Sequence, residues 1–89
     1  MNENVNKVPM TICKAVSLCV RELLNKYQWS QYRLEQQSGV SHSEMDFIMK
    51  NTYKTVNFKI VMQIAKGFEM TLLDFLNSSY FAYDNIDLE

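Results

Sequence analysis

The sequence predicts an all-α fold of five helices in a single domain. Apolar residues recur at spacings of three and four in several segments, which is the pattern of amphipathic helices. No segment alternates polar and apolar residues for long, so no strand is expected. The chain has 89 residues, 47% of them hydrophobic, with two glycines and one proline. That length favours one domain, and that composition allows a packed core.

The first expected helix covers residues 12–27. Thr11 is its candidate N-cap, because a threonine hydroxyl can accept a hydrogen bond from an amide of the first turn. The apolar positions at helical spacing are Ile12, Val16, Cys19, Val20, Leu23 and Tyr27. Residues 1–10 before this helix are mainly polar and are expected to form a loose arm.

Two short helices are expected at residues 31–38, capped by a serine, and 41–50, with Gly39 between them. Glycine just past the last turn commonly ends a helix, because it adopts φ > 0 at little cost. Ser41 and Glu44 form a capping-box pattern, in which the Ser41 hydroxyl accepts from the Glu44 amide and the Glu44 carboxylate reaches back. The apolar positions of the second helix are Met45, Ile48 and Met49.

The last two expected helices cover residues 58–68 and 72–78 and follow a polar connector, "NTYKTV". Asn57 is the expected N-cap of the first, and Thr71 with Asp74 makes a box-like start for the second. The apolar positions in helical period are Phe58, Val61, Met62, Ala65, Phe68, Leu72, Phe75 and Leu76.

The turn at Gly39 has a geometric consequence. The helices at 31–38 and 41–50 must cross steeply within about four residues, so their apolar residues can meet in one small core. These core residues are Leu34, Val40, Met45 and Ile48. The outward side of the second helix then carries His42, Ser43, Asp46, Phe47 and Lys50. Such a pair of helices can offer the second helix to the major groove of DNA.

At these residues the sequence resembles the Cro/repressor-type (XRE, lambda-repressor-like) family of helix-turn-helix transcriptional regulators. "SQYRL" is similar to the family's Ser-Gln-x-x-Leu at the start of its second helix, and "SGVS" looks like its turn. "TVNFKIVMQIAKGFEMTLLDFL" resembles its fourth helix, turn and fifth helix. The similarity covers residues 11–76, and it implies a five-helix lambda-repressor-like domain.

The resemblance also implies roles for individual residues toward double-stranded DNA. The residues at the family's base-reading positions are His42, Ser43, Asp46 and Phe47. The residues at its phosphate-binding positions are Ser30, Gln31, Lys50, Lys54 and Asn57. Base contacts specify a sequence, whereas phosphate contacts orient the protein without reading it.

Two residues depart from the family pattern, and a nearby glycine breaks a general rule for helices. Glu35 stands where a small residue is usual, so its side chain must lean toward solvent or the helix crossing must loosen. Glu69 occupies a turn position that often holds Gly or Asn, and φ > 0 there carries some strain. Gly67 lies within an expected helix, where glycine costs ~1 kcal/mol relative to alanine.

Charge gives a mixed signal for DNA binding. The formal net charge is −1, yet residues 49–68 contain four lysines and no acid. On the expected reading helix, Glu44 has the capping role. Asp46 could read cytosine, pair with a nearby Lys or Arg side chain, or remain solvated. Before Lys50 this helix has no Arg or Lys, the strongest readers of guanine, so binding by a monomer should be modest.

Other function classes find little support in the sequence. No Gly-rich phosphate loop and no nucleophile with a base is evident, so an enzyme is not expected. His42 has no partner at metal-ligand spacing, and no cofactor is implied. Cys13 and Cys19 lie on different faces of one helix and are expected to be buried thiols in a reducing compartment. The absence of an apolar run of about 18 residues and of a signal-peptide core predicts a cytoplasmic protein.

The sequence thus predicts an arm at residues 1–10, a helix-turn-helix domain at 11–79 and an acidic aromatic tail at 80–89. The expected function is sequence-specific DNA binding by a transcriptional regulator, most simply a repressor. The aromatic residues of the tail either fold back on the domain or, as favoured here, join the last helix in a homodimer contact. The alternative is a protein–protein interaction module on the same fold, antitoxin-like or inhibitory, with little DNA binding.

Overall fold

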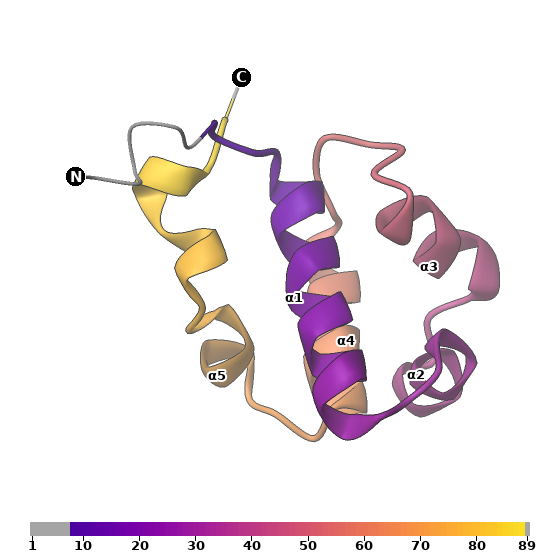
Figure 1. The fold of residues 1–89 in the computed structure, drawn as a ribbon. Coiled ribbons are helices and arrows are strands. Elements are labelled where there is room, and N and C mark those ends of the chain that lie inside the picture. Colours follow the sequence, from indigo (N-terminus) through magenta and orange to yellow (C-terminus); the bar gives the residue numbers. More distant parts are fainter. Residues whose placement is uncertain (1–7, 89) are drawn as a thin grey trace.

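The computed structural model describes residues 8–88, and within them it is all-α, as predicted (Figure 1). The helices are α1 (Ile12–Tyr27), α2 (Gln31–Ser38), α3 (His42–Met49), α4 (Phe58–Gly67) and α5 (Leu72–Leu76). Two 3-10 turns follow, η2 (Ser79–Phe81) and η3 (Tyr83–Asn85). The predicted ends at 68 and 78 were wrong: α4 ends one residue and α5 two residues earlier. Of the expected arm, residues 1–7 lie outside the described part of the chain.

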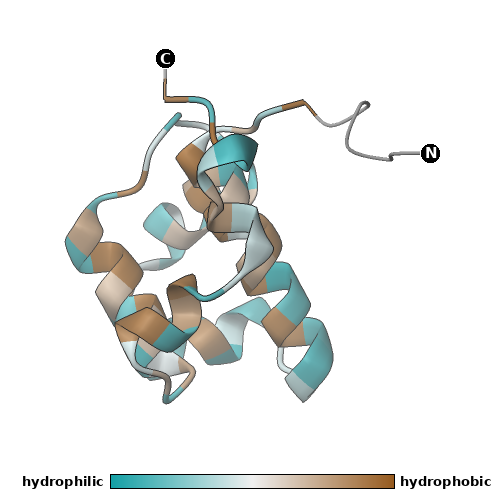
Figure 2. Cartoon of the chain, turned by 90° about the vertical axis from the view of Figure 1, so that its left-hand side faces the viewer, coloured by the Kyte–Doolittle hydropathy of each residue, from teal (hydrophilic) through white to brown (hydrophobic). Residues whose placement is uncertain are grey.

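The long helix α1 runs through the middle of the molecule, and α4 lies behind it in the view of Figure 1. The pair α2 and α3 lies on one side of α1, and α5 with the C-terminal segment lies on the other. Polar and apolar residues are interspersed along each helix (Figure 2), and buried apolar residues from all five helices form one core cluster. The largest fully buried side chains come from all five helices and include Val16, Val20, Leu34, Met45, Ile64 and Phe75.

Every helix begins at the N-cap that the sequence predicts. In each case a side-chain oxygen of the cap accepts a hydrogen bond from an amide of the first turn. The caps are Thr11, Ser30, Ser41, Asn57 and Thr71. Each such bond is worth about 1 kcal/mol, so the helix starts are fixed locally by the sequence.

Two of the four described residues with left-handed backbone, Gly39 and Glu69, are those that the sequence singles out, and the others are Gln28 and Asn51. Gly39 ends α2 with φ 78°, and its amide donates to the Glu35 carbonyl at 3.0 Å. Glu69, between α4 and α5, has φ 60°. Its amide donates to the Lys66 carbonyl at 2.8 Å, and the next amide, of Met70, reaches the Ala65 carbonyl at 2.9 Å. These bonds close the end of α4 and offset the strain of φ > 0 at a glutamate.

Gly67 is explained by a close approach between α2 and α4. A Cβ built at Gly67 would lie 2.8 Å from the Ser38 Cβ and 3.0 Å from the Ser38 Cα. Both distances are too short for carbon atoms, so the two helices can approach this closely only with glycine at that position. Glycine lowers the helix propensity at position 67, but it allows α2 to pack closely against α4.

The C-terminal segment folds back on the domain. The Tyr80 hydroxyl donates to the Glu22 carboxylate at 2.8 Å, and the Phe81 ring packs 6.0 Å from the Phe75 ring between centroids. An isolated parallel bridge joins Met10 to Ile86. Of the two expected placements for the tail aromatics, Tyr80 and Phe81 therefore adopt the intramolecular one, while Tyr83 is 83% exposed.

Both cysteines are free thiols in the core, on opposite sides of α1. The Cys13 thiol donates to the Ile48 carbonyl on α3, and the Cys19 thiol donates to the Phe75 carbonyl on α5. Burial raises the pKa of Cys13, and it raises the pKa of Cys19 to about 11. Both thiols are therefore neutral packing groups, as expected.

None of the described helices has the length and hydrophobicity that a membrane span needs.

Replacing Gly67 with alanine should destabilise the fold. The new methyl group would overlap with Ser38, at a penalty of ~1–3 kcal/mol, whereas the gain in helix propensity is ~1 kcal/mol. Because part of the overlap is with backbone atoms, we expect a net loss of about 1–2 kcal/mol. Urea unfolding followed by circular dichroism measures this difference.

Lys66→Ala is the matched control, because Lys66 is the exposed neighbour of Gly67 on the same helix. Its effect should stay within about 0.5 kcal/mol. A Gly67→Ala protein as stable as the wild type would show that α2 and α4 do not need their close approach.

Candidate nucleic-acid interface

The pair α2 and α3 crosses at Gly39 around the small core that the sequence predicts. Val40 points inward with 5% of its surface exposed, and the other three expected core residues are also buried. These three are Leu34, Met45 and Ile48. The Ser38 hydroxyl accepts from the Val40 amide at 3.1 Å, which fixes the chain as it leaves the turn. The crossing angle of α2 and α3 is thus held by apolar packing and by a local hydrogen bond.

The outward face of α3 carries the four predicted base-facing residues. His42, Ser43 and Phe47 are exposed, and Asp46 is half-buried. The opposite face of α3 is formed by the core residues Met45, Ile48 and Met49. The four residues therefore share one side of one helix, which is the arrangement a groove-reading helix needs.

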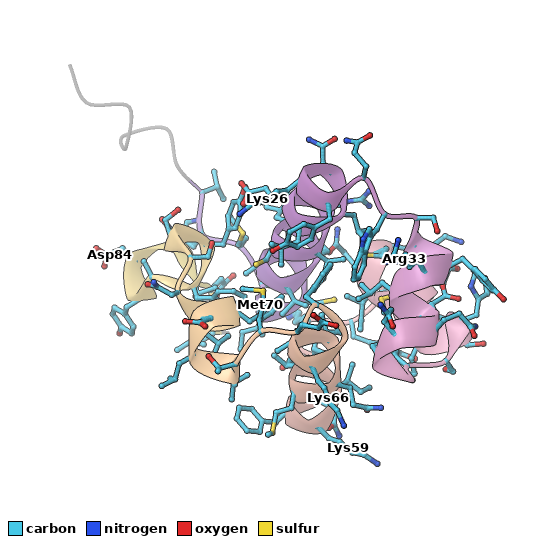
Figure 3. The ribbon with its side chains drawn as sticks, turned by 90° about the horizontal axis from the view of Figure 1, so that it is seen from below. Lys26, Arg33, Lys59, Lys66, Met70 and Asp84 are labelled. Atoms are coloured by element: carbon cyan, nitrogen blue, oxygen red, sulfur yellow. The ribbon has the colours of Figure 1, made fainter. Side chains whose placement is uncertain are left out.

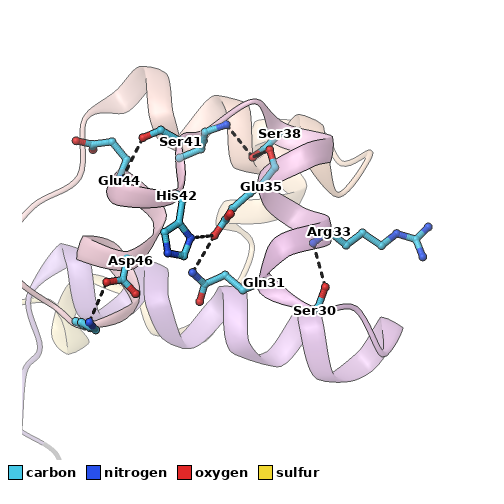
Figure 4. A network of polar contacts seen from close by, with 11 residues as sticks. Ser30, Gln31, Arg33, Glu35, Ser38, Ser41, His42, Glu44 and Asp46 are labelled. Atoms are coloured by element: carbon cyan, nitrogen blue, oxygen red, sulfur yellow. Dashed lines mark hydrogen bonds and ion pairs between the residues drawn. The ribbon is translucent and has the colours of Figure 1, made fainter.

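Glu35 is the main departure from the sequence-based expectation. It was expected to lean into solvent or to loosen the crossing, but it is only 7% exposed. Its carboxylate Oε2 accepts a hydrogen bond from Gln31 Nε2 at 3.0 Å and lies 2.9 Å from His42 Nδ1 (Figure 4). Burial of the carboxylate is tolerated because an amide and an imidazole satisfy it at the point where α2 meets α3.

These contacts shift the pKa of both ionisable partners. The hydrogen bond from Gln31 and the contact with His42 lower the pKa of Glu35 below 4.5, although burial opposes the shift. The hydrogen bond to Glu35 and its negative charge raise the pKa of His42 above 6.5. Glu35 is therefore ionised at neutral pH, and His42 stays protonated to a higher pH than an unpaired histidine.

The structure assigns a partner to Asp46. Its carboxylate lies 2.9 Å from the Nζ of Lys50, one turn further along the chain. Of the three roles that the sequence left open for Asp46, this is the pairing with a nearby basic side chain. The Lys50 side chain is 70% exposed, so the pair is a surface ion pair, and a phosphate can compete for the lysine.

Phe47 is braced from the side of the connector. Its ring packs edge to face against Tyr53, with 5.5 Å between ring centroids, and it remains 37% exposed. This contact restricts the orientation of Phe47 and leaves part of the ring available on the outward face of α3.

The predicted phosphate-binding residues surround this face, and most already have a structural partner. Ser30 and Asn57 are N-caps, Gln31 donates to Glu35, and Lys50 pairs with Asp46. Lys54 is exposed on the connector between α3 and α4. The amides at the start of α2 and α4 add partial positive charge beside the caps.

The connector that carries Lys54 is fastened to α1. The Lys54 carbonyl accepts from the Cys13 amide at 3.1 Å, and the Ser17 hydroxyl contacts the Asn51 side chain at 3.1 Å. Arg21 donates to the Met49 carbonyl at 2.8 Å, which ties the end of α3 to α1 as well. The end of α3 and the connector that follows it are thus positioned by the central helix.

Within residues 8–88, no three His, Cys, Asp or Glu side chains gather in a way that could hold a metal ion. The site's polar groups are hydrogen-bond donors, acceptors and charges on exposed side chains. Such groups suit recognition of a polymer such as DNA.

This fold and this outward-facing helix define a helix-turn-helix domain. Residues 19–78 match the family model of the Cro/C1-type HTH DNA-binding domain, which is more than half of the chain. The chain therefore belongs to the Cro/C1-type family of helix-turn-helix DNA-binding domains, as its sequence resemblance implies. No curated protein and no solved structure matches the chain significantly.

Glu35 and Tyr53 are the site residues that reasoning from sequence missed. The spacing of Gln31 and Glu35 by four residues could have signalled their hydrogen bond within α2. The contacts of Glu35 with His42 and of Tyr53 with Phe47 depend on how separate segments cross, so no local pattern announces them.

The Glu35–His42 contact should be visible in the titration of His42. Because this is the only histidine, its ring signals in NMR spectra are unambiguous. We expect a midpoint above 6.5 in the wild type and a return toward 6.5 in Glu35→Gln, which keeps the shape and removes the charge. Asp46→Asn is the matched control and should lower the midpoint less, since Asp46 contributes less than Glu35.

The contribution of Glu35 and His42 to the free energy of unfolding should decrease at both high and low pH. The raised pKa of His42 contributes stability below about 6.5, and this is lost as pH rises through the folded-state pKa. The lowered pKa of Glu35 contributes above about 4.5, and this is lost as pH falls through the folded-state pKa. An NMR titration midpoint of His42 at or below 6.5 in the wild type would contradict the contact between Glu35 and His42.

Proposed function

We propose that this protein is a sequence-specific DNA-binding transcriptional regulator, acting as a repressor, that places α3 in the major groove of duplex DNA. The observation that carries the proposal is the outward face of α3 in a chain of the Cro/C1-type DNA-binding family. A groove about 12 Å wide admits an α-helix. A domain bound there excludes other proteins from the same DNA, which is the simplest route to repression.

Each base-facing residue has chemistry suited to a base edge. His42 and Ser43 can donate or accept hydrogen bonds, and the exposed part of the Phe47 ring can pack on a thymine methyl group. Asp46 can accept from a cytosine amino group through the carboxylate oxygen that does not contact Lys50. If Lys50 moves to a phosphate, both oxygens of Asp46 become available for a base edge.

The phosphate contacts would flank α3. Ser30 and Gln31 lie at the start of α2, where the helix N-terminus favours an anion. Lys50 and Lys54 follow α3, and Asn57 caps α4. These groups would hold the DNA backbone on both sides of the reading helix.

The double substitution Lys50→Ala with Lys54→Ala tests the phosphate contacts. It should weaken binding to all DNA sequences about equally and reduce the slope of log affinity against log salt by about two units. Fluorescence anisotropy of random-sequence duplex DNA, titrated with salt, measures both quantities.

Lys26→Ala with Lys66→Ala is the matched control, because it removes the same charge from exposed positions on α1 and α4 (Figure 3). It should change the salt slope much less. If both double variants lose the same amount of DNA affinity, the loss depends on net charge and not on the positions of Lys50 and Lys54. If the wild type does not bind DNA even at low salt, the proposed function is wrong and the alternative of a protein–protein interaction module is favoured.

We further propose that the protein binds DNA as a homodimer through α5 and the C-terminal segment. Exposed apolar side chains gather there, including Leu73 and Tyr83, which are 79% and 83% exposed. A groove of about 650 Å³ between α1, α4, α5 and this segment is lined mainly by apolar residues. Two copies would present two reading helices to paired half-sites, which compensates for the lack of Arg on α3.

Sedimentation equilibrium tests this dimer. The wild type should sediment as a dimer at micromolar concentration, and Leu73→Glu with Tyr83→Glu should be monomeric, since charges do not bury well in an apolar contact. Tyr32→Glu places the same charge at an exposed residue of α2 and should remain dimeric. A monomeric wild type that still binds DNA would remove the dimer and leave the DNA-binding function standing.

A further inference from the structure

The candidate reading helix lacks Arg and Lys before Lys50, yet it begins with a histidine held by a buried acid. We propose that Glu35 is a positioning residue that fixes the ring of His42, and that the His42 imidazolium so held reads a guanine through its Nε2–H group. This proposal rests on the proposed function, because it requires α3 to lie in the major groove. It adds that one position of the preferred DNA site would contain guanine.

The geometry determines which ring nitrogen meets DNA. Glu35 Oε2 lies 2.9 Å from His42 Nδ1, and an ionised carboxylate can only accept a hydrogen bond. Nδ1 therefore carries a hydrogen, and Nε2 is the nitrogen left for a ligand. The His42 side chain is 76% exposed, while Glu35 is 7% exposed, so the buried acid holds the inner edge of the ring and leaves the outer edge accessible.

The charge state of the ring decides which base that nitrogen can read. In the neutral ring held at Nδ1–H, Nε2 is an acceptor and suits the amino groups of adenine or cytosine. In the imidazolium, Nε2–H is a donor and suits the N7 and O6 acceptors of guanine. One histidine at this position can thus change its preferred base with its protonation state.

The charges around His42 favour the protonated ring. From α2, Glu35 faces it and raises its pKa, and the neighbouring Gln31 is neutral. From α3 itself, Asp46 raises the pKa and Lys50 lowers it, both less than Glu35 does. The ion pair between Asp46 and Lys50, with 2.9 Å between its charged atoms, makes these two opposing effects partly cancel. The guanine-reading form therefore extends to a higher pH than it would in an isolated histidine.

Gln31 completes the arrangement. Its amide donates to the same carboxylate oxygen, Glu35 Oε2, that contacts His42 (Figure 4). With this second donor the carboxylate stays ionised while buried, so it remains an acceptor for His42 throughout the neutral pH range. Glu35 thereby links a residue at the start of α2 to the first residue of α3.

The test is selection of preferred sites from a random-sequence duplex pool at about pH 5.5 and about pH 8.5, on either side of the ordinary histidine pKa. The wild type should select guanine at one position by about tenfold or more over other bases at the lower pH, as expected for one hydrogen bond from a charged donor. This preference should weaken at the higher pH, where Nε2 becomes an acceptor. Competition anisotropy with two duplexes that differ only at that base gives the ratio directly.

Two variants separate the roles of the residues. His42→Gln can still donate to Glu35 but has no titrating group, so its base preference should not change with pH. Glu35→Gln should keep the selection of guanine at the lower pH and lose it at a less basic pH than the wild type. His42→Ala provides a second check, because it also removes the titrating group while Gln31 still donates to the Glu35 carboxylate.

Several outcomes would overturn the proposal. A guanine preference that is equal at both pH values, or pH dependence that persists in His42→Gln, would assign the readout to another group. Affinity that rises uniformly at the lower pH without a change of preferred base would show a phosphate contact by His42. Failure to bind any DNA at either pH would refute the proposed function itself, and this result is distinct from binding that lacks a pH-dependent guanine.

Discussion

The close approach of α2 to α4 is the constraint on which the DNA-binding shape depends. Gly67 presents no side chain where Ser38 comes within 3.0 Å of the space a Cβ would fill. Seated there, α2 ends at Gly39, and the chain turns into α3 with its core face already directed at α1. The outward face of α3 is therefore a consequence of how closely two other helices can pack.

Charge on this surface is organised around the same corner. An acid in the place of a small residue at the α2–α3 crossing would ordinarily be penalised by burial. Here Glu35 accepts from Gln31 and holds His42, so the buried charge orients two residues at the edge of the candidate interface. A single substitution relative to the family pattern thus changes both the packing of the crossing and the chemistry offered to a ligand.

Much of the fold could be predicted from the sequence because its signals are local. Helical spacing of apolar residues, five capping side chains and the left-handed positions at Gly39 and Glu69 all act within a few residues, and the structure has each of them. The contact of Glu35 with His42 and the hydrogen bond from Tyr80 to Glu22 join separate segments of the chain. Sequence periodicity carries no information on such contacts, so the first was missed and the return of the C-terminal segment was only one of two alternatives.

The acids near α3 bear on the choice between DNA and a protein partner. An interaction module would use unpaired acids as its recognition surface, whereas two of the three acids here contact a basic side chain. Glu35 holds His42 and Asp46 pairs with Lys50, while Glu44 lies in the first turn of α3, where the helix dipole favours a negative charge. With Glu35 and Asp46 paired, His42 and the lysines after α3 contribute most to the electrostatic character of the candidate interface. The number of acidic residues on a helix therefore says little about its ligand until the partner of each carboxylate is known. Here the partners of Glu35 and Asp46 favour DNA.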